Sequence, residues 1–197
     1  MKPNYLSSII VITLAACFFS SAVNAIDVMP SNLEDLQTLN DTELNELYDY
    51  GTAYAIPGSH SPRTDWLLTG LPLPVPGYEG PSELLNFFWG GKTFTTDHFG
   101  NTSLTNQVLP TTPFTFNNVS AVVTIRDNSL TNDSAPVIFL NYKKSNVRIS
   151  RPVRDELRLI APNLYLGRAY LKNSLITRVI TGQKYSFVLW FALEDRN

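Results

Sequence analysis

The chain has 197 residues with 15 Lys or Arg and 17 Asp or Glu, which gives a formal net charge of −2. The length suits one domain, and the small negative charge argues against nucleic acid or an anionic membrane as a partner. The single cysteine, Cys17, lies in the N-terminal segment, so the rest of the chain has no disulfide, thiolate metal site or cysteine nucleophile.

The first segment, residues 1–25, is typical of a signal peptide. Lys2 precedes the apolar run Ile9–Phe19, which is shorter than the roughly 20 residues of a membrane span. Val23-Asn24-Ala25 supplies the small residues that precede a cleavage site. We therefore expect an exported protein, periplasmic or secreted. The alternative is a lipoprotein, because Leu14-Ala15-Ala16-Cys17 fits a bacterial lipobox, and only then is a membrane a partner.

Residues 26–51 form the predicted helical segment. Apolar residues recur there at helical spacing: Leu33, Leu36, Leu39, Leu44, Leu47 and Tyr48. Asn40 and Glu43 match a capping box, which predicts two short helices with a break at Asn40. This amphipathic segment is expected to cover one end or side of a sheet.

The domain that follows, residues 52–197, opens with a Pro-rich stretch at 57–81. Six prolines and the glycines at 58, 70, 77 and 80 exclude a regular helix or a central strand there. We predict a long loop.

From Lys92 onward, short apolar or alternating segments are joined by polar turns. The predicted strands are 92–96, 104–109, 114–126, 136–142, the two arms of a hairpin at 151–171, 175–180 and 185–194. The last strand, Tyr185–Glu194, is apolar on both faces and should be covered on both sides. The pattern predicts an all-β fold, an antiparallel up-and-down barrel with a helical cover, and the alternative is a two-sheet sandwich.

Patterns that mark common catalytic and metal sites are missing. The sequence has no G-x-S-x-G, H-E-x-x-H, G-x-G-x-x-G or G-x-x-x-x-G-K motif. Its two histidines, His60 and His98, fall in separate predicted loops, so neither a metal nor a cofactor is predicted. The loop 127–134 has oxygen ligands at alternate positions but lacks the glycine and glutamate of a calcium loop. We interpret it as a solvated hairpin turn.

The hairpin 151–171 carries the candidate polar site. Asp155 shares one strand face with Val153, Leu157 and Leu159, and a buried carboxylate there needs a partner. A two-residue turn at 162–163 would place Asp155 opposite Tyr170 and diagonal to Arg168. A one-residue change of register would place Gly167 and Ala169 on that face instead.

Three interpretations of Asp155 follow. The simplest is an internal ion pair that fixes register, and the alternatives are a ligand anchor or an acid–base catalyst. Arg154, Glu156 and Arg158 alternate on the opposite face and are interpreted as a solvent-facing charge ladder.

Several motifs resemble those of a known family. They are Trp89-x-Gly91-Lys92-x-Phe94, Asn106, Ile138-Phe139-Leu140-Asn141-Tyr142, Arg154-Asp155-Glu156-Leu157-Arg158, Pro162-x-Leu164-Tyr165-Leu166-Gly167 and Phe191-Ala192-Leu193-Glu194. Together they resemble a family of uncharacterised bacterial proteins, and the first is similar, more weakly, to GXWXG-domain proteins. The resemblance covers about 52–194 and implies a calycin-like barrel, as in lipocalins and fatty-acid-binding proteins, without an established reaction. The chain departs at Asn141, where Asp is usual, and at Asn163, where Gly is usual. The first departure weighs against chemistry that needs a carboxylate beside Tyr142.

The leading hypothesis is therefore an exported lipocalin-like protein, not an enzyme, that binds a small apolar or amphipathic molecule such as a lipid. The residues expected to line its pocket are Trp89, Phe94, Tyr142, Tyr165 and Tyr170, with Asp155 and Arg168 as polar anchors. One alternative is an enzyme for a lipid-like or carbonyl substrate, with Asp155 or Glu156 as acid–base and Tyr170 as donor. Another is an envelope interaction protein with a solid barrel.

Overall fold

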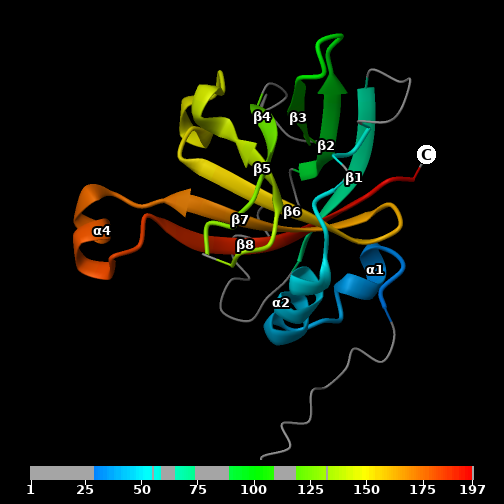
Figure 1. Ribbon diagram of the computed structural model, residues 1–197, viewed down its shortest axis with the longest axis horizontal. Coiled ribbons are helices and arrows are strands. Elements are labelled where there is room, and N and C mark those ends of the chain that lie inside the picture. Colours follow the sequence, from blue (N-terminus) through cyan, green and yellow to red (C-terminus); the bar gives the residue numbers. More distant parts are fainter. Residues whose placement is uncertain are drawn as a thin grey trace, which may run out of the picture.

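The computed structural model describes residues 29–54, 56–58, 65–73, 89–108, 119–131 and 133–196. Within these residues, eight strands form one closed antiparallel barrel in which sequence neighbours pair (Figure 1). The strands are β1 (Asp65–Leu73), β2 (Trp89–Thr96), β3 (Thr102–Val108), β4 (Ser120–Arg126), β5 (Val137–Asn141), β6 (Val153–Ala161), β7 (Leu164–Lys172) and β8 (Tyr185–Glu194). Strands β1 and β8 pair to close the cylinder. The predicted up-and-down barrel is confirmed.

Strand β1 lies inside the Pro-rich stretch, where a loop was predicted, so that prediction is wrong for 65–73. The pairing explains how a strand tolerates Pro72. β1 pairs with β2 only from Asp65 to Thr69, and with β8 from Thr69 to Leu73. Pro72 therefore lies beyond the part of β1 that pairs with β2, so its missing N–H removes no hydrogen bond between these two strands.

The N-terminal segment forms two helices, α1 (Leu33–Leu36) and α2 (Asp41–Tyr50). The predicted capping box is confirmed, since the Asn40 side chain accepts from the Glu43 backbone N–H and the Glu43 carboxylate accepts from the Asn40 N–H. Both helices lie against the outside of the barrel (Figure 1). They therefore cover the outer face of the strands that they cross.

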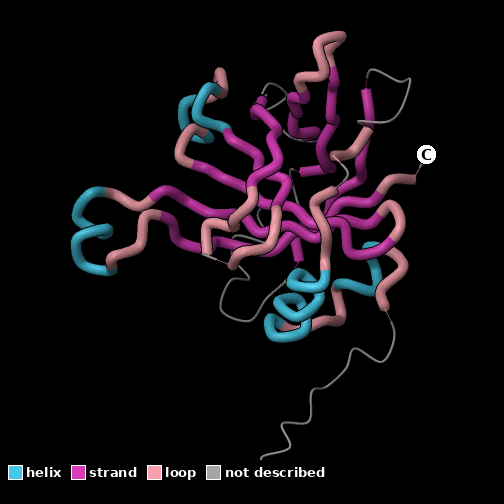
Figure 2. Tube along the Cα trace, in the orientation of Figure 1, coloured by secondary structure: helices cyan, strands magenta, loops and turns pink. Residues whose placement is uncertain are grey.

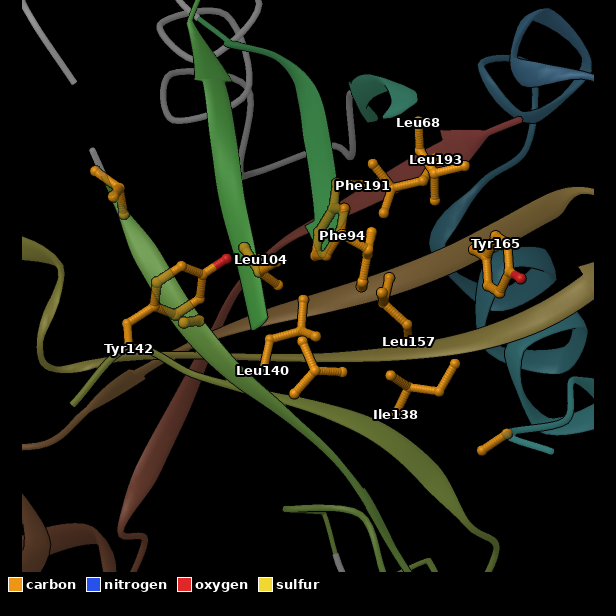
Figure 3. Close-up of a cluster of buried hydrophobic side chains, with 14 of the residues drawn as sticks. Leu68, Phe94, Leu104, Ile138, Leu140, Tyr142, Leu157, Tyr165, Phe191 and Leu193 are labelled. Carbon is orange, nitrogen blue, oxygen red and sulfur yellow. The ribbon is translucent and has the colours of Figure 1, made fainter. Parts of the chain in front are cut away.

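Two cores result, one on each side of the barrel wall. Inside, apolar side chains from β1 to β8 meet around Phe94, Leu140 and Leu157 (Figure 3). Outside, leucines of α1 and α2 pack on residues of β7 and β8. β8 serves both cores, because Phe191 is part of the first and Trp190 of the second. The expectation that this strand is covered on both faces is confirmed.

Short helical segments connect the strands at one end. The connection β5–β6 contains the 3-10 turns η1 (Tyr142–Lys144) and η2 (Arg148–Ser150), and the connection β7–β8 contains helix α4 (Leu175–Thr181). The prediction of a strand at 175–180 is wrong. Ser174 caps α4 by accepting from Thr177 N–H, and Gly182 ends it with φ 71°. Among the described helices, none is long and apolar enough to cross a membrane.

The β6–β7 register differs from the preferred prediction. Asp155 faces Ala169, Arg154 faces Tyr170 and Glu156 faces Arg168, with an irregularity between Leu159 and Ala161. That extra residue in β6 shifts all pairs beyond it by one, which moves Arg168 and Tyr170 to the face opposite Asp155. The turn residue Asn163 has φ 63°, the left-handed conformation that glycine and asparagine adopt more readily than other residues.

Candidate functional site

A cluster of four polar side chains lies inside the barrel. Lys92 of β2 donates to Asn106 Oδ1 of β3 at 2.8 Å, to Tyr142 Oη at 2.7 Å and to Asp155 Oδ2 of β6 at 3.0 Å. Tyr142 donates its hydroxyl proton to the same Asp155 oxygen at 2.8 Å. Lys92 and Asp155 form an ion pair with 4% and 6% of their side chains exposed. We call this group the inner cluster.

A bulge in β2 brings Lys92 to the inner face together with Trp89. The register shifts between Trp89 and Gly91, and two residues three apart on a regular strand would point to opposite faces. Gly91 has φ 135°, and a Cβ there would lie 2.0 Å from the Leu68 carbonyl oxygen, so only glycine fits. The bulge therefore places an aromatic ring and a cation on the same side of the wall.

Aromatic rings surround the Lys92 ammonium. Its Nζ lies 5.1 Å from the Trp89 ring centroid, 5.0 Å from that of Phe191 and 5.4 Å from that of Tyr142. Burial lowers the pKa of Lys92, although the neighbouring Asp155 acts in the opposite direction. Burial, and then the charge of Asp155, raises the pKa of Tyr142 well above its usual value. The tyrosine therefore remains a proton donor at neutral pH.

One atom of the inner cluster lacks a partner. Asp155 Oδ1 is buried without a hydrogen bond from any described residue. Lys92 has three N–H groups and all three have acceptors, and the Tyr142 proton is already donated. Among Lys92, Tyr142 and Asp155, the buried hydrogen-bonding position left unused is thus an acceptor, and a buried carboxylate oxygen left unsatisfied is costly.

The structure brings together most of the residues predicted for the pocket, but not all. Phe94, Tyr142 and Tyr165 belong to the inner core and Trp89 packs against it, while Asp155 belongs to the inner cluster. Figure 3 shows Tyr142 and Tyr165 at opposite ends of that core.

Arg168 and Tyr170 lie on the outer side, so the predicted cluster of Asp155 with these two residues is wrong. Sequence reasoning missed Lys92, Asn106 and Phe191. The alternation of Lys92 with Phe94 in β2 was the available signal for the lysine.

The outer face of β6 carries a second polar group, which includes Glu156 and Arg158. Arg154, Glu156 and Arg158 were predicted to face solvent. In the structure Arg154 is 6% exposed, and Glu156 and Arg158 are 0% exposed. Arg158 donates to the backbone carbonyls of Tyr48, Ala135 and Pro136. The prediction of a solvated ladder is wrong because α2 and the β4–β5 turn cover this face.

We call this second polar group the outer network. Its remaining bonds join β6 to the β4–β5 turn. Glu156 accepts from Ser129 Oγ and from Leu130 N–H, both at 2.6 Å. Arg158 Nη2 bonds to Asp133 Oδ1 at 2.6 Å. Burial raises the pKa of Glu156, and the hydrogen bond from Ser129 acts against it. The network holds the β4–β5 turn and the end of α2 on the barrel wall.

Arg168 stands next to this network beside an outer pocket of about 330 Å³. Its guanidinium lies 4.0 Å from the Tyr48 ring centroid and 4.7 Å from that of Trp190, and it donates to Asn45 Oδ1 of α2 at 2.7 Å. Tyr170 also lines the pocket. Thr131 and Arg168 lie close enough to affect the pKa of its hydroxyl, which burial raises to about 12, yet no described residue meets hydrogen-bond geometry with it.

The two groups differ in the chemistry that they offer. The inner cluster offers a carboxylate oxygen to a hydrogen-bond donor inside an aromatic surrounding, and the outer pocket offers mixed polar groups at the surface. Within the described residues, no three His, Cys, Asp or Glu side chains are grouped to hold a metal ion. Asp155 and Glu156 face opposite sides of β6, so they do not form a carboxylate pair.

Comparison with protein-family models gives no match, and comparison with curated proteins gives none. Among solved structures, a protein from Thermomonospora curvata is similar with 15% sequence identity and a TM-score of 0.42. The alignment covers 81% of this chain and 89% of that one.

Proposed function

We propose that the protein is an exported lipocalin-like carrier that binds a small amphipathic molecule inside the barrel. The closed wall and the aromatic and aliphatic interior suit the apolar part of such a ligand. The inner cluster suits its polar end, because its polar side chains converge in that apolar surrounding.

The unpartnered Asp155 Oδ1 is the observation that carries the proposal, and it defines the polar end of the ligand. The atom accepts hydrogen bonds, so the matching group is a hydroxyl, an amide N–H or an ammonium. A free carboxylate matches poorly, because Asp155 would repel it and Lys92 has no unused N–H group. We therefore infer a ligand with a donor headgroup, such as a long-chain alcohol, rather than a fatty acid.

The test compares two fluorescent probes that differ only in the headgroup, a pyrene-labelled long-chain alcohol and the corresponding acid. At neutral pH the wild-type protein should bind the alcohol about tenfold more tightly than the acid. Asp155→Asn should reverse this preference, because the change leaves the Lys92 cation without its carboxylate. Asp127→Asn, at an exposed position in the β4–β5 turn, is the matched control and should leave the preference unchanged.

Other outcomes would point to the alternatives. Binding that depends on Tyr170 but not on Asp155 would move the site to the outer pocket. Absence of binding for both probes would favour an interaction protein with a solid barrel. Turnover of a carbonyl probe that is lost in Asp155→Asn, with folding intact, would favour the enzyme.

A further inference from the structure

Two connections at one end of the barrel expose apolar and basic side chains together. β5 and β7 run in the same direction, so the β5–β6 and β7–β8 connections leave the barrel at the same end. Figure 2 shows their helical segments on one side of the molecule and α1 and α2 on another. We call residues 142–152 and 172–184 the basic end.

Helix α4 is the apolar part of the basic end. Its large apolar side chains are Leu175 (74% exposed), Ile176 (74%), Val179 (78%) and Ile180 (77%), and no residue of α4 is buried. Their spacing places all four on one face of the helix, opposite Thr177, Arg178 and Thr181. Contiguous apolar exposure of this kind marks a contact surface rather than ordinary protein surface.

The charge of the basic end has one sign. Its exposed basic residues are Lys143, Lys144, Arg148, Arg151, Lys172, Arg178 and Lys184, and these two described connections contain no acidic residue. The helices α1 and α2 carry only acidic charges, among them Glu34, Asp41 and Asp49. The net charge of −2 therefore hides a separation of charge along the molecule.

We propose that the basic end docks on an anionic lipid surface. The apolar face of α4 enters the boundary between headgroups and acyl chains, and the surrounding cations contact the phosphates. This combination of a short apolar face with flanking basic residues is the general requirement for interfacial binding. The proposal does not depend on what the barrel binds, although it would place the barrel at a source of amphipathic molecules.

A second copy of the chain is a poorer occupant of this surface. Four side chains on a seven-residue helix fall far short of the roughly 800 Å² that each partner buries in a stable interface. Self-association through this end would also bring two sets of seven cations together. An anionic lipid surface offers acyl chains to the apolar face of α4 and negative charge to the seven cations.

The experiment measures flotation of the purified, processed protein with vesicles of phosphatidylcholine alone or mixed equally with phosphatidylglycerol. Wild-type protein should float with the anionic vesicles and not with the neutral ones, and high salt should weaken the binding. The double variant Ile176→Asn with Val179→Asn should reduce binding at least tenfold. Because both positions are about three-quarters exposed, the fold should not change.

Two further variants make the result specific. Phe99→Asn changes a side chain that is 78% exposed in the β2–β3 turn, at the opposite end of the barrel, and should leave binding unchanged. Lys143→Gln with Lys144→Gln should weaken binding about fivefold for each charge removed.

Three results would overturn the proposal. The first is equal flotation with both kinds of vesicle or with neither. The second is loss of binding in Phe99→Asn as large as in the α4 double variant. The third is a wild-type dimer that the α4 double variant converts to a monomer, which would assign the surface to a second copy.

Discussion

The two faces of strand β6 carry polar residues of similar type in different roles. On the inner face, the Asp155 carboxylate accepts hydrogen bonds from the side chains of Lys92 and Tyr142, and one of its oxygens has no partner among the described residues. On the outer face, Arg158 contacts three backbone carbonyls and an aspartate, and thereby joins α2 and the β4–β5 turn to the wall.

This difference separates a binding role from a structural role. A side chain that bonds backbone carbonyls of several elements cannot be replaced by an apolar one without leaving those carbonyls unsatisfied. A buried ion pair can be replaced as a pair by apolar side chains, at the cost of the hydrogen bonds that it makes to other groups. We therefore expect the outer network to determine stability and the inner cluster to determine ligand preference.

Removal of Arg158 should have the largest effect. Arg158→Ala removes the side-chain donor to the carbonyls of Tyr48, Ala135 and Pro136 from a fully buried position, and the Tyr48 carbonyl keeps its bond from Gly51 N–H. We expect the free energy of unfolding to fall by about 3–5 kcal/mol, measured by urea denaturation. Arg148→Ala, at an exposed arginine, is the control. A decrease in the free energy of unfolding below about 1 kcal/mol for Arg158→Ala would contradict the structural role of the outer network.

The inner ion pair should behave differently in single and double variants. Lys92→Met leaves Asp155 buried without its cation and should cost about 3 kcal/mol at neutral pH. Lys92→Met combined with Asp155→Leu should recover only part of this loss, because no buried charge remains but the Tyr142 hydroxyl loses both of its partners. A double variant as unstable as the single one would show that the pair is needed for the fold.

The same change, tyrosine to phenylalanine, can be made at a buried residue on each side of the barrel wall, Tyr142 inside and Tyr170 outside. Tyr142→Phe removes hydrogen bonds to Lys92 and Asp155 and should cost about 1–3 kcal/mol. Tyr170→Phe removes a hydroxyl without a described partner and should leave stability unchanged or slightly higher. The same denaturation experiment measures both, and equal losses would contradict the assignment of partners.

Glu156 should give the smallest effect, seen as a pH dependence. Burial raises its pKa in the folded state above the ordinary 4.5, so the folded protein holds this proton to higher pH than the unfolded chain does. Its contribution to stability is therefore present below pH 4.5 and is lost as pH rises through the folded pKa. Urea midpoints from acidic to neutral pH should fall less steeply in Glu156→Gln than in the wild type. Parallel curves would contradict this prediction.

The sequence allowed prediction of the features that depend on local patterns. Alternation assigned Asp155 and Glu156 to opposite faces of one strand, and the Asn40–Glu43 box located the start of α2. The barrel followed from the succession of short strands and polar turns. Each of these features depends on residues close together in the chain, where periodicity and capping chemistry act directly.

Features that depend on distant pairing could not be predicted. The observed β6–β7 register was predicted only as the alternative, because the sequence does not show the irregularity between Leu159 and Ala161 that sets it. Lys92 and Asp155 are 63 positions apart, so their contact emerges only from closure of the barrel. Strand β1 tolerates Pro72 because of where its neighbours end, which is a property of the sheet.

Helix α4 shows a third kind of error. Its β-branched residues favour a strand, but Ser174 and Gly182 supply a start and a stop for a helix. In an exposed connection without neighbouring strands, the caps decide the outcome.

The most direct test identifies small molecules released from the protein as purified from its source. Mass spectrometry of the wild type should detect an amphipathic molecule with a hydroxyl, amide or amine headgroup. The double variant Lys92→Met with Asp155→Leu, folded but without the inner cluster, should release it in much smaller amount. Equal amounts from both proteins, or a fatty acid bound to the wild type, would contradict the assignment of Asp155 as the ligand anchor.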